Sequence, residues 1–246
     1  MAAPDNSRRS SVPWVAMYHS VNDCTEDPYR ITVTPERLDK QLTWLRRRGL
    51  HGVSMARLLA ARAEGEGRDL VGLTFDDGYA DFLTEALPVL RRHDCTATLF
   101  VLPGRFGGDN AWDPLGPRKP LLTADGIRRA ADEGVEIGSH GLTHVDLTQA
   151  DDLTLKKETV DSRAALSALL GTEIDGFCYP YGTIDQRAVD AVREAGYRYA
   201  CAIDPGELNG LHALPRVHVG QDDNTLRLFL KYRLHGLRRR RVEGLR

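Results

Sequence analysis

The stretch LTFDDGYADF, Leu73 to Phe82, decides how this chain is interpreted. Apolar and β-favouring residues run directly into two neighbouring carboxylates, Asp76 and Asp77, and a glycine follows them. Adjacent aspartates repel each other, and burial raises the free energy of ionising each one. A cation held by one carboxylate would offset that repulsion and leave the other free as a base. The alternative is a helix N-cap followed by a solvated neighbour.

Segments typical of strands and of helices alternate along the 246 residues. The helix expected over 35–48, for example, has Thr34 as its N-cap and Gly49 just beyond its end. About seven strand–helix units fit, which predicts an α/β chain with parallel strands in a closed or nearly closed (β/α) barrel. We expect a single domain over 1–246, with a polar N-terminal tail (1–12) and a basic C-terminal tail (236–246).

Composition excludes several classes of function. The net charge of −2 implies no general attraction to nucleic acid. The four scattered cysteines, in no metal-binding spacing, predict reduced and mostly buried thiols. Neither a signal-peptide pattern nor a membrane-spanning stretch is found, so we expect a cytoplasmic protein without a transmembrane segment. The basic tail is interpreted as a solvated helix end, or alternatively as a weak contact with a membrane surface or another polyanion.

A second polar motif, IGSHGLTHVD (137–146), follows another short predicted strand. His140 and His144 are four residues apart, which would place both imidazoles on one side of a helical turn. Carboxyl ends of parallel strands meet at one end of a barrel, so these histidines should lie near Asp76 and Asp77. Two histidines and one carboxylate form a metal site with open positions for water and substrate. Two unrelated histidines are the alternative.

The motifs TFDDG, SHGLTH and YPYG, in this order and spacing, resemble the polysaccharide deacetylase (NodB-homology) family of carbohydrate esterases. The resemblance extends from about Trp14 to Leu230. It implies a distorted (β/α) barrel and a divalent metal, usually zinc, with cobalt, nickel or manganese as alternatives. It also implies a hydrolase acting on carbon–nitrogen bonds other than peptide bonds. Such an enzyme removes an N-acetyl group from an amino sugar, glycan or glycosylated intermediate by attack of a metal-bound water.

The same resemblance assigns roles to residues in the three motifs. Asp77, His140 and His144 would be the metal ligands. Asp76 would be the general base, and the backbone N–H of Tyr181 would stabilise the oxyanion.

The chain departs from the family pattern at the third motif. The family has Arg-x-Pro-Tyr there, and its arginine orients the base, whereas this chain has Cys178. A thiol cannot form the bidentate pair that a guanidinium forms with a carboxylate. Arg216, in the later strand-like stretch LPRVHV, is the candidate replacement partner of Asp76. A structural salt bridge elsewhere is the alternative for Arg216.

The general acid also departs from the common pattern, because the late Leu-x-His motif is not clearly present. His218 lies in that part of the chain without the expected context. His19, in AMYHSV after the first predicted strand, resembles the Tyr-His motif of members that act on poly-N-acetylglucosamine. That resemblance implies His19 as the acid that protonates the leaving amine. A core histidine bound to backbone is the alternative, and His218 stays open as the acid.

One long loop, Pro103 to Pro120, is expected to be functional or mobile. Its Trp112 could stack on a sugar face or pack the loop onto the barrel. Two other functions stay open for the chain as a whole. One is a metal-dependent deacylase of a non-sugar amide or O-acetyl ester in secondary metabolism, and the other is a non-catalytic carbohydrate-binding barrel. Asp76 argues against the second, because a binding module has little need of a free base.

Overall fold

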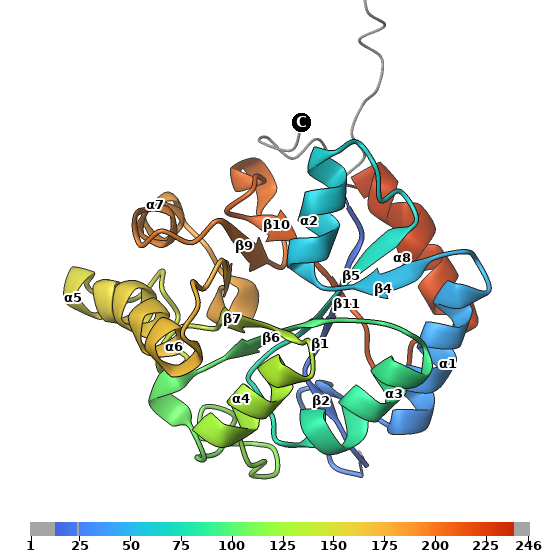
Figure 1. Cartoon of the computed structure of the whole chain (residues 1–246), viewed down its shortest axis with the longest axis horizontal. Helices are drawn as coiled ribbons and strands as arrows, with labels where there is room; N and C mark the ends of the chain where they lie inside the picture. The colour runs from blue at the N-terminus through green and yellow to red at the C-terminus, as the bar shows by residue number, and fades with distance from the viewer. Residues whose placement is uncertain (1–12, 24, 239–246) are drawn as a thin grey trace, which may run out of the picture.

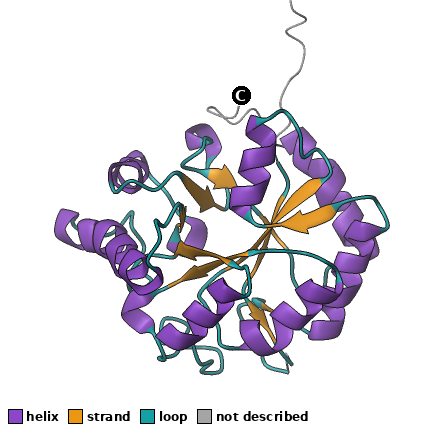
Figure 2. Ribbon diagram, in the orientation of Figure 1, coloured by secondary structure: helices purple, strands orange, loops and turns teal. Residues whose placement is uncertain are grey.

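Parallel strands lie at the centre of the molecule, and helices surround them (Figures 1 and 2). The computed structural model describes residues 13–23 and 25–238. The expected tails, 1–12 and 236–246, fall outside the residues whose side chains are described, and so does Cys24. The extent of the domain at both ends therefore stays a prediction.

The main sheet contains nine strands, all paired in parallel. They are β1 (Val15–Tyr18), β4 (His51–Val53), β5 (Leu70–Phe75), β6 (Thr98–Val101), β7 (Glu136–Ser139), β8 (Gly176–Cys178), β9 (Tyr199–Ala202), β10 (Leu214–Pro215) and β11 (Val217–His218). Their order is β10–β9–β8–β7–β6–β5–β1–β11, and β4 pairs with the first half of β5. A separate pair consists of β2 (Ser20–Val21) and β3 (Thr32–Val33).

Helices connect most of these strands along the outside of the sheet (Figure 1). They are α1 (Pro35–Arg46), α2 (Met55–Ala63), α3 (Leu87–Arg92), α4 (Ala124–Asp132), α5 (Asp152–Lys156), α6 (Ser162–Leu170), α7 (Gln186–Glu194) and α8 (Thr225–Arg238). The expected N-caps Thr34 and Thr123 accept hydrogen bonds from backbone N–H groups in the first turns of α1 and α4. None of the helices in the described part of the chain is long and apolar enough to span a bilayer.

The ring of strands closes through one interrupted strand. β10 and β11 are separated only by Arg216, yet β10 pairs with β9 and β11 pairs with β1. The two edges of the sheet are thereby joined, and the barrel expected from the alternation of elements is confirmed. Arg216 lies at the point where the strand changes partner, and its side chain is buried inside the barrel.

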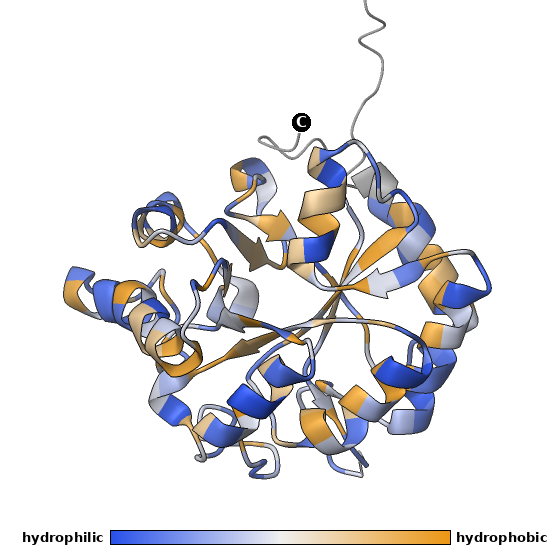
Figure 3. Ribbon diagram, in the orientation of Figure 1, coloured by the Kyte–Doolittle hydropathy of each residue, from blue (hydrophilic) through white to orange (hydrophobic). Residues whose placement is uncertain are grey.

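Alternate residues of the strands face opposite sides, which produces two hydrophobic clusters. Val15, Phe100 and Leu214 belong to the smaller cluster, and their strand neighbours pack in the larger one with the surrounding helices. Figure 3 shows the strands of the centre coloured largely as hydrophobic. Among the described cysteines, Cys178 and Cys201 are buried and Cys95 is half-buried, and all three are free thiols. This agrees with the expectation of reduced, mostly buried cysteines.

Candidate active site

One cavity at the carboxyl ends of the strands collects the candidate site residues. Its volume is about 180 Å³. All seven candidates line it: His19, Asp76, Asp77, His140, His144, Tyr181 and Arg216. They come from the ends of β1, β5, β7 and β8 and from the break between β10 and β11, so residues far apart in sequence meet there.

Three of these side chains converge on a single point. Oδ1 of Asp77 lies 3.3 Å from Nε2 of His140 and 3.3 Å from Nε2 of His144. Zinc binds such atoms at about 2.0–2.2 Å, so two tetrahedral ligands lie about 3.4 Å apart. Oδ1 of Asp77 is buried and has no well-formed hydrogen bond within the described part of the chain. The spacing and the unsatisfied oxygen both fit a divalent cation held by these three groups.

The two histidines also control the ionisation of Asp77. Burial opposes ionisation, but the nearby imidazoles of His140 and His144 outweigh it and hold the pKa of Asp77 well below its usual range. Asp77 is therefore an anion at neutral pH, which is the form that binds a metal ion.

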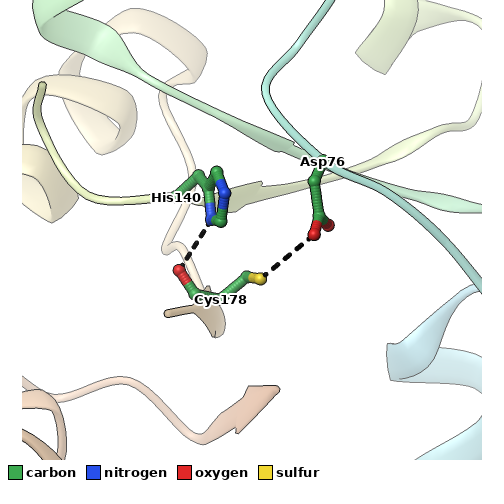
Figure 4. Close-up of side chains that lie close together, drawn as sticks. All are labelled: Asp76, His140 and Cys178. Carbon is green, nitrogen blue, oxygen red and sulfur yellow. Dashed lines mark hydrogen bonds between the residues drawn. The ribbon is translucent and has the colours of Figure 1, made fainter. Parts of the chain in front are cut away.

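His140 is oriented by a backbone carbonyl. Its Nδ1 lies 2.8 Å from the carbonyl oxygen of Cys178 (Figure 4). A hydrogen bond to a carbonyl requires the proton on Nδ1, which leaves the lone pair of Nε2 directed at the Asp77 site. This arrangement is the usual way in which proteins fix the tautomer of a metal-binding histidine.

Figure 4 also shows a second group of potential metal ligands, made by Asp76, His140 and Cys178. Burial raises the pKa of the Cys178 thiol well above its usual range, so the thiol keeps its proton and is a poor ligand. Both oxygens of Asp76 already accept hydrogen bonds from Arg216. The group centred on Asp77 therefore suits a metal better than the group centred on Cys178.

The segment between the two histidines differs from the expectation. It is an irregular loop after β7, and the predicted helical turn is absent. Gly141 (φ 84°) and His144 (φ 71°) have left-handed backbone, and this brings the second imidazole back towards the first. The spacing of four residues thus produces the expected convergence of the side chains through a different backbone path.

A residue that the sequence analysis missed supports this loop. The carboxylate of Glu158, from the helix that follows, accepts hydrogen bonds from the N–H groups of Leu142 (2.6 Å) and Thr143 (3.0 Å). Glu158 is 2% exposed and lies in a π-helical turn, Lys157–Asp161, between α5 and α6. The only signal in the sequence is an acidic residue on the otherwise apolar or small face of that helix.

Asp76 has a permanent cationic partner. Arg216 donates from Nη1 to Oδ1 (2.6 Å) and from Nη2 to Oδ2 (2.7 Å), a bidentate pair. Burial opposes ionisation of Asp76, but the charge and hydrogen bonds of Arg216 outweigh it, so the pKa of Asp76 is lowered. Nη2 also donates to Sγ of Cys178 (2.9 Å), the residue at which the family resemblance leads us to expect an arginine. β8 carries a cysteine at residue 178, and the guanidinium that pairs with Asp76 comes instead from Arg216, between β10 and β11.

The two candidate acids occupy different places. Nε2 of His19 lies 3.8 Å from Oδ2 of Asp76, and the side chain lines the cavity. Nε2 of His218 instead lies 3.0 Å from the carbonyl oxygen of Arg30, and His218 is not among the residues lining the cavity. Of these two histidines, only His19 lines the cavity that contains Asp76.

Left-handed backbone is concentrated at this site. Five described residues other than glycine have positive φ, and three of them are Asp77 (70°), His144 (71°) and Tyr181 (60°). Such a conformation costs about 1–3 kcal/mol each and persists where surrounding structure holds it. Tyr181 is followed by Gly182 (φ 69°), where a Cβ would collide with Ile203. The strained turn therefore sets the position of the Tyr181 peptide at the cavity.

The long loop closes one side of the cavity. The ring of Trp112 stacks on the ring of His144, with centroids 4.4 Å apart and planes 17° apart. Its neighbour Asp113 also lines the cavity, and burial together with the charge of Asp77 raises the pKa of Asp113 to about 6. Of the two expectations for Trp112, packing onto the barrel is observed, and stacking on a sugar stays a prediction.

Comparison with known proteins identifies relatives of this chain. The sequence model of one family, described as polysaccharide deacetylase, matches residues 63–200, more than half of the chain. A putative polysaccharide deacetylase of Bacillus subtilis, YxkH, is 25% identical over 210 residues, covering 83% of this chain and 70% of that protein. The poly-beta-1,6-N-acetyl-D-glucosamine N-deacetylase of Escherichia coli O157:H7 is 25% identical over 272 residues, covering 89% of this chain but only 39% of that protein.

A solved structure has the same fold. The Streptococcus pyogenes deacetylase PplD in complex with acetate superposes with a TM-score of 0.75 over 90% of this chain and 98% of that chain, at 24% identity. The nearly closed parallel barrel is therefore shared with this protein. Asp76, Asp77, His140, His144 and Tyr181 fall within the segment matched by the family, whereas His19 and Arg216 lie outside it.

Proposed function

The chain belongs to the polysaccharide deacetylase family, and from that premise we propose that it is a metal-dependent hydrolase that removes an N-acetyl group from an amino sugar or a glycan containing one. The observation that carries the proposal is that Asp76 and Asp77 line one cavity but have different partners. Asp77 faces two imidazoles, and its neighbour faces a guanidinium. A cation site and a separate base are the two components that hydrolysis of an unactivated amide requires.

We propose Asp77, His140 and His144 as the ligands of the cation. Two imidazoles and one carboxylate suit zinc, with cobalt, nickel or manganese as alternatives. When bound, such a cation lowers the pKa of a water molecule and polarises the acetyl carbonyl. The buried Oδ1 of Asp77 and the Nε2 atoms of the two histidines are the atoms that would hold it.

Asp76 is proposed as the general base. Its carboxylate takes a proton from the attacking water, and the bidentate pair with Arg216 keeps it ionised and fixes its orientation. Arg216 is thus a positioning residue, which acts through Asp76. A base with a fixed direction favours proton transfer along one path into the cavity.

His19 is proposed as the general acid, because it lines the cavity and its Nε2 lies 3.8 Å from Asp76. A proton donated from this nitrogen would allow the amide nitrogen to leave as a neutral amine. The backbone N–H of Tyr181 would donate to the carbonyl oxygen as negative charge develops on it. The left-handed turn at Tyr181 fixes the position of this peptide beside the cavity.

The cavity has room for an acetamido group. At about 180 Å³ it holds the volume of roughly six water molecules at ~30 Å³ each. It is smaller than the roughly 300–1,000 Å³ of pockets that enclose a drug-sized ligand. The acetamido group would therefore enter, while the rest of a glycan would lie outside the cavity. The cytoplasmic location expected from the sequence stays a prediction.

Acetate release tests the proposal. Zinc-loaded protein would be assayed on β-1,6-linked N-acetylglucosamine oligomers, on O-acetylated sugars and on simple N-acetyl amides. We expect the largest kcat/KM on an N-acetylated sugar, with Asp76→Asn as the matched control for contaminating activity. Equal or faster turnover of the O-acetyl sugar or the simple amide would favour a deacylase of another substrate class. Absence of acetate release from every substrate would favour a binding barrel.

A further inference from the structure

The outward face of α8 is apolar. Leu226 (64% exposed), Leu230 (46%) and Leu234 (37%) lie four residues apart, so they form one line along the helix. Phe229 (39%) lies beside that line. Nine large hydrophobic side chains are exposed in the described part of the chain, and four of them belong to this one helix. We call these four residues the α8 stripe.

The α8 stripe lies on the side of the helix away from the residues that are buried against the barrel. Leu228 and His235, on the opposite side of the helix, are buried. Tyr232, between them, packs edge-on against Trp14 and Trp44. A helix with one buried face normally presents polar residues to solvent on the other. The stripe therefore needs an explanation outside the barrel itself.

Arginines frame the α8 stripe. The guanidinium carbon of Arg48, just after α1, lies 5.6 Å from the ring centre of Phe229, and that of Arg233 lies 6.0 Å from it. Both arginines are exposed, and neither takes part in the ion pairs found in the described part of the chain. The sequence that follows continues with four consecutive arginines, 238–241. Apolar and basic groups are thus placed together on one surface.

We propose that the α8 stripe docks on the surface of an anionic lipid bilayer. The helix would lie in the plane of the interface, with the leucines entering the boundary between headgroups and acyl chains. Arg48 and Arg233 would contact the lipid phosphates. With 14 residues, α8 is too short to cross the bilayer, so it lies on the surface.

Two other occupants fit the surface less well. A soluble polyanion would be bound by the arginines but would leave the leucines exposed to water. A second copy of this chain related by two-fold symmetry would bring the same arginines close to one another, where like charges repel. A negatively charged bilayer satisfies both the apolar line and the positive frame.

Vesicle co-sedimentation of the full chain tests the docking. We expect the protein to sediment with vesicles of phosphatidylcholine mixed with phosphatidylglycerol, and to bind roughly tenfold more weakly to phosphatidylcholine alone. The double variant Leu226→Gln/Leu230→Gln should lose binding to the anionic vesicles. Leu153→Gln is the matched control, because Leu153 on α5 is also 64% exposed and lies outside the stripe. Arg233→Gln is a milder second variant and should weaken binding by a smaller factor.

Three results would overturn the proposal. They are no binding of the wild-type chain to anionic vesicles, equal binding by the double variant, and loss of binding in Leu153→Gln. Sedimentation velocity without lipid adds a fourth, since a wild-type dimer that the double variant dissociates would assign the stripe to a second copy. Acetate release from a soluble substrate should be unchanged in the double variant. Failure of docking is therefore distinguishable from failure of the proposed function.

Discussion

Asp76 and Asp77 are neighbours in sequence and almost equally buried, yet their surroundings differ in kind. Asp76 is paired with a guanidinium that stays charged at every accessible pH. Asp77 faces two imidazoles, whose charge depends on pH, and keeps an unsatisfied buried oxygen. Two carboxylates at the end of one strand are therefore supplied with countercharge in two separate ways.

The difference explains why the chain tolerates adjacent buried aspartates. A carboxylate with a bidentate arginine already has a countercharge and does not require a metal ion to balance its charge. A carboxylate between two imidazoles, which lose their charge as the pH rises, lacks a permanent countercharge, and a divalent cation would supply it. The first is suited to accept a proton and the second to hold a metal. The experiments below test this contrast, from the largest expected effect to the smallest.

His140→Ala tests whether the group around Asp77 holds a cation. Removal of one of two imidazoles should release the cation, and turnover should fall to background. Metal content by mass spectrometry and acetate release check both effects. His51→Ala, in β4 and away from the cavity, is the matched control and should keep both metal and activity. Full metal occupancy in His140→Ala would remove this residue from the ligand set.

Asp76→Asn tests whether Asp76 is the general base. The amide keeps the shape of the carboxylate but cannot accept a proton, so kcat should fall by about 10³–10⁴, near the upper end for loss of a general base. Single-turnover acetate release measures this. Activity close to that of the wild type would show that another group acts as the base.

His19→Ala should lower kcat by about 10²–10⁴ through loss of the general acid. The effect should be smaller on a substrate with a good leaving group, because such a group departs without protonation. His218→Ala is the internal control, since His218 lies outside the residues that line the cavity, and its kcat should change little. The reverse pattern, with His218→Ala the slower enzyme, would transfer the role to His218.

Arg216→Met should change the pH dependence more than the maximal rate. Arg216 lowers the pKa of Asp76, so its removal leaves burial to raise that pKa. The base is active when deprotonated, and the acidic limb of the kcat/KM profile should therefore move to higher pH. Arg216→Lys, which keeps a charge, should move the limb less. If the acidic limb stays at its wild-type pH in both variants, the pair with Arg216 does not set the pKa of the base.

The group of Asp77, His140 and His144 was easier to predict from the sequence than the pair of Asp76 and Arg216. Asp77, His140 and His144 each follow a predicted strand within a short motif, so their convergence could be anticipated from the parallel arrangement. The backbone that achieves it was predicted wrongly, as a helical turn. The left-handed residue His144 and the support from Glu158 depend on a helix packed against the loop, which local spacing does not encode.

Arg216 shows the limit of sequence reasoning most clearly. It could be named as a candidate because it lies in the strand-like stretch LPRVHV, but a salt bridge elsewhere was an equal alternative. Its contact with Asp76 spans 140 residues and depends on a strand that changes partners at Arg216 itself. Such pairing is decided by the closure of the whole barrel. The pairing of Arg216 with Asp76 therefore becomes visible only in three dimensions.

Metal stoichiometry in the two neighbouring aspartate variants tests the central contrast most directly. Asp76→Asn and Asp77→Asn would be purified alike, loaded with zinc, freed of excess and measured for bound metal per chain. The account predicts that Asp76→Asn retains one zinc ion and that Asp77→Asn retains none. Equal loss of metal in both variants, or retention of metal by Asp77→Asn, would contradict the division between a carboxylate that holds the cation and one that takes the proton.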